Sequence, residues 1–467
     1  MAVNSLWKRD LARYPAPAYR WLLLVTTTLV TVALYYVFYV LGSASTLIIT
    51  EFHWSLDKYI YIGAAAQLMG AVSAVAGGFG DRFGRANLLI VASAVSVVCA
   101  FLMAHAHNGN YFIVLYCLLG LFEGFALVMS STLMRDFSPR VGRGIAMGMW
   151  TIGPVGGSYI ASKVAGDLLA SGHSWRDLYT VAIVTALIVW VISAALLRDL
   201  SPQIRNEVII QAERNVLEVQ SSSASGAAAP TTTAQRTLTL ADRFPPRLLV
   251  PAAGVTLYLL IYVAAVSVFP LYLVSMFGFK LSTANNMMSL FWLVNVLSAL
   301  LWGGLSDWLR VRKPFLTAGA VMMFFATLVF ALRLGHPTSQ AAMTWILVIM
   351  GFVVACGFAP WMAAISETAE EIAPTRVAYG MAIFGSVQRI IGVVVAIIMP
   401  HVIGTESGWR TWWIVCLAGI ALYIPTVPVL CGRWRPHKPE TKVLDVDVSG
   451  LRSGVTPSSA PQQRARH

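Results

Sequence analysis

Long apolar segments alternate with short polar loops along most of the chain. Clear examples are WLLLVTTTLVTVALYYVFYVL at residues 21–41 and DLYTVAIVTALIVWVISAALL at residues 177–197. A helix of about 20 apolar residues crosses a hydrocarbon core, whereas a lone strand in lipid leaves its backbone polar groups unpaired. The pattern predicts an all-α polytopic membrane protein with twelve transmembrane helices, at about residues 20–42, 58–79, 87–105, 111–134, 144–168, 178–198, 248–276, 283–304, 315–334, 342–365, 378–401 and 412–431.

A long polar segment separates the sixth predicted span from the seventh. Its middle, SSSASGAAAPTTTAQ, has the composition of a flexible linker, and the segment after about residue 438 is also polar. The expected organisation is an N-terminal tail (1–19), a six-helix bundle (20–198), a linker (199–247), a second six-helix bundle (248–431) and a C-terminal tail (432–467).

The two halves of the chain repeat one another. Four landmarks recur in the same order at offsets of 223 to 235 residues: Asp81 and Asp307, Trp175 and Trp409, Pro139 and Pro374, and the pair Tyr35 and Tyr39 with Tyr258 and Tyr262. The repeat predicts two pseudo-symmetric six-helix bundles, an arrangement that places a substrate site between the halves near the membrane midplane.

The loop after the second span, GGFGDRFGR (77–85), resembles the signature GxxxDRxGR of the major facilitator superfamily through Gly77, Asp81, Arg82, Gly84 and Arg85. This resemblance implies alternating access and a latch that closes the cytoplasmic side. Asp81 could accept from a helix N-terminus or pair with a cation such as Arg135, and a solvated turn is the alternative. Asp307 and Arg310 belong to the matching loop of the second half. GLFEG (120–124) is similar to a stretch of the anion–cation symporter branch, with Tyr116 in place of its leading arginine. GPVGG (153–157) is one residue shorter than the GPxxGG of drug–proton antiporters.

The charge distribution predicts how the chain is oriented. The formal net charge is +12, and 26 of the 33 Lys and Arg residues fall in the segments on the side of the two termini. By the positive-inside rule, both termini are expected in the cytoplasm, with the protein in a bacterial inner membrane. Orientation in the bilayer accounts for the basic residues, so no nucleic-acid partner is expected.

Ionisable side chains inside the spans are the main candidates for function, because such groups are costly in lipid. Arg389, next to Gln388 in the eleventh span, could grip an anionic substrate or form a structural ion pair. Glu123 in the fourth span could load and release a proton, or pair with Arg389. If both side chains meet in one cavity, protonation of Glu123 would favour binding of an anion to Arg389. Lys163 and Asp167 are expected to form an i,i+4 pair.

Aromatic and amide side chains are predicted to complete a polar central cavity. Tyrosines share one face of the first span and one face of the seventh, and a tyrosine at depth needs a partner for its hydroxyl. The candidate substrate-binding residues are Tyr35, Tyr39, Tyr258, Tyr262, Gln67, Asn295 and Trp361. For each of them, packing within the core is the alternative.

The sequence contains no phosphate loop, no HExxH and no Cys/His cluster, so we expect no cofactor, no metal site and no enzyme activity. The leading hypothesis is a monomeric secondary transporter that imports a small organic anion with protons. The alternatives are a drug or metabolite–proton antiporter that works in export, and, from a different class, a membrane sensor or scaffold that does not transport.

Overall fold

The computed structural model describes residues 9–75, 83–138, 143–205, 207, 245–372 and 377–435. The first half of the chain forms six long helices and one short helix, α3, that follows α2. Their bounds are α2 (Pro17–Ser43), α3 (Ser45–Glu51), α4 (Leu56–Val75), α6 (Arg85–Ala104), α7 (Gly109–Phe137), α8 (Arg143–Ala170) and α9 (Trp175–Leu196). Each corresponds to a predicted span or extends one.

The second half repeats this arrangement with one broken span. Its helices are α12 (Pro246–Tyr258), α13 (Leu260–Ser267), α14 (Phe269–Phe277), α15 (Leu281–Leu309), α16 (Lys313–Ala331), α17 (Gln340–Ile372), α18 (Val377–Val402), α19 (Glu406–Tyr423) and the 3-10 helix η3 (Ile424–Val429). The seventh predicted span is thus divided into α12, α13 and α14, and α12 and α13 meet at a bend of 44°. The twelfth comprises α19 and η3.

The predicted twelve-helix membrane architecture is confirmed. Nine helices among the described residues are long and apolar enough to cross a membrane, and the bent pair α12–α13 is a tenth. The more polar helices α4 and α8 complete the set, with 20 and 28 residues respectively. One detail escaped the all-α prediction, a two-residue parallel pairing of β1 (Asp10–Leu11) with β2 (Asp199–Leu200).

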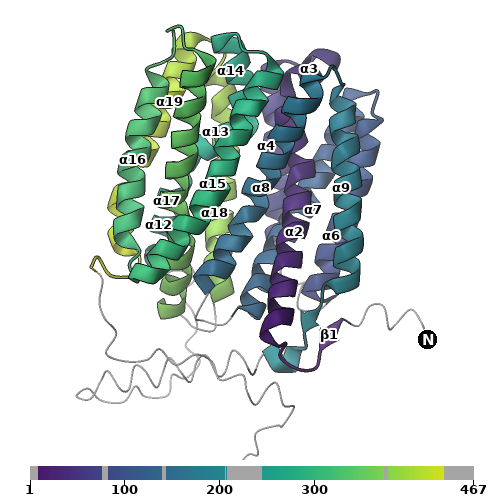
Figure 1. Ribbon diagram of the computed structural model, residues 1–467, viewed down its shortest axis with the longest axis vertical. Coiled ribbons are helices and arrows are strands. Elements are labelled where there is room, and N and C mark those ends of the chain that lie inside the picture. Colours follow the sequence, from purple (N-terminus) through teal and green to yellow (C-terminus); the bar gives the residue numbers. More distant parts are fainter. Residues whose placement is uncertain are drawn as a thin grey trace, which may run out of the picture.

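The two sets of helices lie side by side, and α2 begins and η3 ends at the same end of the molecule (Figure 1). We name this end the terminal face, and the end that carries α3 and α14 the opposite face. The halves meet mainly where α8 packs on α15 and where α4 packs on α18. These two contacts frame the space between the halves.

Contacts between the halves close the opposite face. The Tyr59 hydroxyl donates to the Ser267 carbonyl at 3.0 Å, and the Asn285 side chain donates to the Ser43 carbonyl at 2.9 Å. Close backbone approach accompanies these bonds, because a Cβ atom at Gly42 would collide with the carbonyl oxygen of Val266. Small residues permit such approach between membrane helices.

The repeated tryptophans anchor aromatic clusters near the opposite face. Trp175 begins α9, contacts Phe112 and Tyr179, and donates its indole N–H to Glu51. Trp409 lies in the first turn of α19 and packs on Tyr272 at a ring separation of 4.5 Å. The repeat in the sequence therefore marks equivalent packing positions in the two bundles.

Candidate functional site

A central cavity of about 640 Å³ lies between the halves and receives side chains from both. It reaches the terminal face, since Arg85, the first residue of α6, and Arg135, near the end of α7, both line it. Among the described residues that line it, four are charged: Arg85, Glu123, Arg135 and Arg389. The candidate site is therefore a deep cavity that is closed at the opposite face.

The structure brings together the two ionisable residues that the sequence placed at membrane depth. Arg389 Nη2 lies 3.5 Å from Glu123 Oε2, across the interface between the halves. Both side chains are buried, with 6% and 7% of their surfaces exposed. Arg389 Nη1 is also buried and has no hydrogen-bond partner among the described residues. The carboxylate therefore occupies only part of the guanidinium fork.

Gly70 on α4 makes room for this pair. A Cβ atom at this position would lie 3.1 Å from the Gly120 carbonyl oxygen, 3.4 Å from Glu123 Oε2 and 3.5 Å from Arg389 Nη2. Gly124, one turn after Gly120 on α7, packs equally closely on the backbone of Gly70. Close packing of α4 on α7 thus places Glu123 within reach of an arginine from α18.

Three of the four predicted tyrosines line the cavity. Tyr35 and Tyr39 on α2 face Tyr262 on α13 within the lining, and the Tyr35 hydroxyl lies within hydrogen-bonding reach of Glu123. The Tyr262 ring packs on Trp292 at a separation of 5.2 Å. These side chains surround the ion pair with polarisable rings and hydroxyl groups.

Tyr258 and Trp361 lie outside the cavity. The Tyr258 hydroxyl donates to the Val354 carbonyl at 2.9 Å, and its ring packs on Tyr423. Trp361 is fully buried behind Phe384, whose side chain does line the cavity. The bend at Leu259 accounts for the difference between the two halves, because it separates Tyr258 from Tyr262, whereas α2 runs without interruption past Tyr35 and Tyr39.

The three predicted amide residues all line the cavity: Gln67 on α4, Asn295 on α15 and Gln388 on α18. Asn295 is buried, with 3% of its surface exposed. Away from the cavity, Lys163 and Asp167 form the expected i,i+4 ion pair at 2.7 Å. Polar groups from three helices thus complement the central pair.

The signature loop lies partly outside the described residues, including Gly77, Asp81 and Arg82. Gly84 adopts a φ of +87°, a conformation that favours glycine and turns the chain into α6. Arg85 pairs with Asp136 of α7 at 2.5 Å. This part of the loop therefore fixes the start of α6 against the end of α7.

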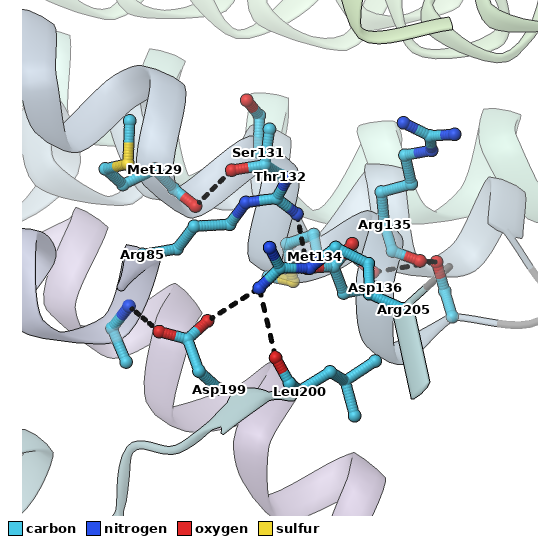
Figure 2. Close-up of polar contacts among 12 residues, drawn as sticks. Arg85, Met129, Ser131, Thr132, Met134, Arg135, Asp136, Asp199, Leu200 and Arg205 are labelled. Carbon is cyan, nitrogen blue, oxygen red and sulfur yellow. Dashed lines mark hydrogen bonds and ion pairs between the residues drawn. The ribbon is translucent and has the colours of Figure 1, made fainter. Parts of the chain in front are cut away.

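Residues that the sequence reasoning did not select complete this cluster at the terminal face (Figure 2). Arg205, after α9, lies 3.5 Å from Asp136 and 3.6 Å from Asp199. The Asp199 carboxylate accepts the backbone N–H of Ala86 at 2.8 Å, which satisfies a free donor in the first turn of α6. Burial raises the pKa of Asp199 to about 6, and the Ala86 N–H and Arg205 partly oppose this rise.

The second half has its own ion cluster, built on an arginine that the sequence reasoning also missed. Asp307 pairs with Arg312 at 2.5 Å, and Arg312 also reaches Glu367 of α17 at 3.0 Å. Arg310, the predicted member of this loop, ends α15 with a φ of +56°. The left-handed turn at Arg310 lets the chain reverse, so that Arg312 rather than Arg310 meets Asp307.

No group of three or more His, Cys, Asp or Glu residues that could hold a metal occurs within the part of the chain that is described. The cavity's chemistry is therefore that of one ion pair, three amides, several aromatic rings and two further arginines.

Comparisons with known proteins agree with this architecture. A family profile described as Major Facilitator Superfamily matches residues 27–373 and 252–457. The chain belongs to the major facilitator superfamily. A structure of a D-xylose–proton symporter aligns with a TM-score of 0.62, and a structure of the xylose transporter XylE from E. coli in a partially occluded inward-open conformation aligns with a TM-score of 0.65. They are 15% and 16% identical, with 87% of this chain and 96% of theirs covered.

Curated relatives match shorter stretches. The multidrug efflux pump LfrA of Mycolicibacterium smegmatis is 31% identical over 146 residues, which is 31% of this chain and 29% of the pump. The inner membrane metabolite transport protein YgcS of Escherichia coli is 30% identical over 123 residues, 25% of this chain and 26% of that protein. The chain thus aligns with less than a third of either relative. Membership of the superfamily, together with the membrane helices, establishes an integral, multi-pass membrane protein.

Proposed function

We propose that this transporter takes up a small organic anion, a carboxylate, together with protons. The observation that carries the proposal is the buried Arg389–Glu123 pair, in which one terminal nitrogen of the guanidinium has no partner within the described part of the chain. A guanidinium fork binds a carboxylate with two parallel hydrogen bonds, so Arg389 has capacity for a second oxyanion. The surrounding cavity of about 640 Å³ has room for a small molecule.

Competition between the Glu123 carboxylate and the substrate carboxylate for Arg389 couples substrate transport to proton transport. While Glu123 is ionised, it holds Arg389 and repels an incoming carboxylate. Protonation of Glu123 removes its charge, and the substrate carboxylate can then take its place on the arginine. Loss of the proton after the halves have rocked restores the original pair and expels the substrate. One proton therefore accompanies each carboxylate in this scheme.

The orientation of the protein in the membrane follows from the charge of the loops. The Lys and Arg residues concentrate on the terminal face, which we assign to the cytoplasm of a bacterial inner membrane by the positive-inside rule. The cavity then opens inward in this structure. The gate residues of the signature loop and its counterpart would close this side when the halves rock.

Drug–proton antiport is the second candidate. It is supported by the relatives named as multidrug efflux pumps and by the many aromatic rings around the cavity. In that case Glu123 would bind a cationic drug or a proton in turn, and Arg389 would serve only as its structural partner.

Transport in proteoliposomes distinguishes the two candidates. We expect radiolabelled benzoate or another small carboxylate to accumulate when an inward proton gradient is imposed. Arg389→Gln should abolish both accumulation and carboxylate exchange, whereas Glu123→Gln should abolish accumulation but retain exchange, since exchange needs no net movement of protons. Lys163→Gln, which removes a charge from an exposed side chain outside the cavity, is the control for loss of a charge. Accumulation of carboxylate by Arg389→Gln, or uphill export of cationic drugs by the unmodified protein, would refute the proposal.

A further inference from the structure

The mouth of the cavity at the terminal face carries a net positive charge, because the Asp136 carboxylate, which attracts Arg135, is also paired with Arg85 and Arg205. Of the cavity's charged residues, Arg389 is paired with Glu123, and Arg85 is paired with Asp136. Within the described chain, no hydrogen bond or ion pair reaches the Arg135 guanidinium. An arginine in the wall of a cavity without a partner is available to an anion from outside.

The side chains next to Arg135 separate it from the acidic cluster. Asp136, the following residue, points toward Arg85 and Arg205, whereas the Arg135 side chain extends away from these groups (Figure 2). Successive helical residues lie on different faces, so the carboxylate is directed to the base of the first half and the guanidinium to the cavity. Ser131 and Thr132, about one turn earlier on α7, line the cavity beside it.

Arg135 is too far from Arg389 to share one small ligand. Twelve residues separate Arg135 from Glu123 on the continuous helix α7, which corresponds to about 18 Å along the axis. Arg389 is held at the level of Glu123 by their contact. A small carboxylate that touches Arg389 therefore leaves Arg135 free.

We propose that Arg135 forms a second, outer binding station for carboxylates, which holds the anion at the terminal mouth of the cavity before it reaches Arg389 or after it leaves. The passage from the outer to the inner station rests on the proposed function, but binding at Arg135 does not require it. Ser131 and Thr132 add polar groups to the station, although their hydroxyl hydrogens are used by backbone carbonyls of α7.

A cysteine reporter beside the station tests its charge. In the full chain, Ser131→Cys is labelled with the anionic reagent MTSES and the cationic reagent MTSET, and the unmodified chain gives the background of the five native cysteines. Even in a water-like dielectric, a unit charge about 6 Å away changes the ratio of the two rates about tenfold. Arg135→Gln should lower the MTSES-to-MTSET ratio by that factor. Arg135→Lys and the exposed control Arg13→Gln should leave it nearly unchanged.

Protection of the same reporter tests binding. Benzoate should slow labelling of Ser131→Cys at least threefold, whereas the neutral benzyl alcohol should not. Arg135→Gln should abolish the protection, and Arg389→Gln should preserve it. The proposal is overturned if benzoate gives no protection, if protection survives Arg135→Gln, or if Arg389→Gln also removes it, because the last result would mean one continuous site. Carboxylate exchange that survives Arg389→Gln would refute the proposed function and leave the outer station standing.

Discussion

Removing one charge of the Glu123–Arg389 pair should destabilise the protein more than removing both. At 3.5 Å and an effective dielectric constant of 20, two unit charges attract by about 5 kcal/mol, and much of this offsets the cost of burying them. Loss of one partner leaves a buried charge alone, which costs about 3–5 kcal/mol. We therefore expect Glu123→Gln and Arg389→Gln each to lower the free energy of unfolding by that amount.

The double variant carries two neutral amides at the same site and should recover part of the loss. Because the double variant should lose less stability than either single variant, the interaction energy from the double-mutant cycle should be at least about 3 kcal/mol, measured by denaturant or thermal unfolding in detergent at pH 7.5. Lys163 and Asp167 provide the matched control, since their separation is shorter, 2.7 Å, but their side chains are 47% and 55% exposed. That pair should contribute less than about 1 kcal/mol.

The reasoning would be refuted if the single variants at Glu123 and Arg389 changed stability by less than about 0.5 kcal/mol. Strict additivity in the double variant would also refute it, because the two charges would then not interact. A large effect at the exposed control pair would show that distance rather than burial decides the energy.

Three further predictions address other parts of the structure. Gly70→Ala should crowd the Gly120 carbonyl and the central ion pair. It should therefore slow carboxylate exchange and lower the free energy of unfolding by about 1–3 kcal/mol. Gly303→Ala is the control and should be neutral, because a new Cβ there meets nothing within 4 Å. Gly42→Ala should force the halves apart at the opposite face, so that spin-label distances between α3 and α14 lengthen; unchanged distances would contradict the contact with Val266. Asp199 has a raised pKa of about 6, so its contribution to stability is present in acid and is lost as the pH rises through 6. The stability of the protein relative to Asp199→Asn should therefore fall by about 1.4 kcal/mol between pH 5 and 7.5, and a pH-independent difference would contradict this.

The sequence predicted the helices well because lipid imposes their length and composition. Most predicted spans end within a few residues of the observed helices, as for 20–42 and α2. The exception is the span predicted at 248–276, because the break at Leu259 lies in a continuous apolar stretch and no charged residue, glycine or proline marks it in the sequence. That break removes Tyr258 from the cavity, although its spacing from Tyr35 equals that of Tyr262 from Tyr39.

The central ion pair of the candidate site was predictable, because a charge buried in the membrane needs a partner of opposite charge. Glu123 and Arg389 are isolated ionisable residues within apolar spans, and their burial favours a contact between them, which the structure shows. The ion clusters built on Arg205 and Arg312 could not be predicted from the sequence in this way. Arg205 and Arg312 lie in polar loops among other basic residues, and only the path of the chain shows which arginine meets Asp136 or Asp307.

The contacts that close the opposite face are weak enough to break during a transport cycle. The bonds from Tyr59 to Ser267 and from Asn285 to Ser43 are neutral, and each contributes roughly 0.5–1.5 kcal/mol. A ligand shifts a two-state equilibrium by as much as its affinities for the two states differ. A carboxylate that replaces Glu123 on Arg389 alters an attraction of about 5 kcal/mol across the same interface. In the proposed scheme, a difference of a few kcal/mol in this attraction between the two states would exceed the contribution of the two neutral bonds and would link occupancy of the central site to rocking of the halves.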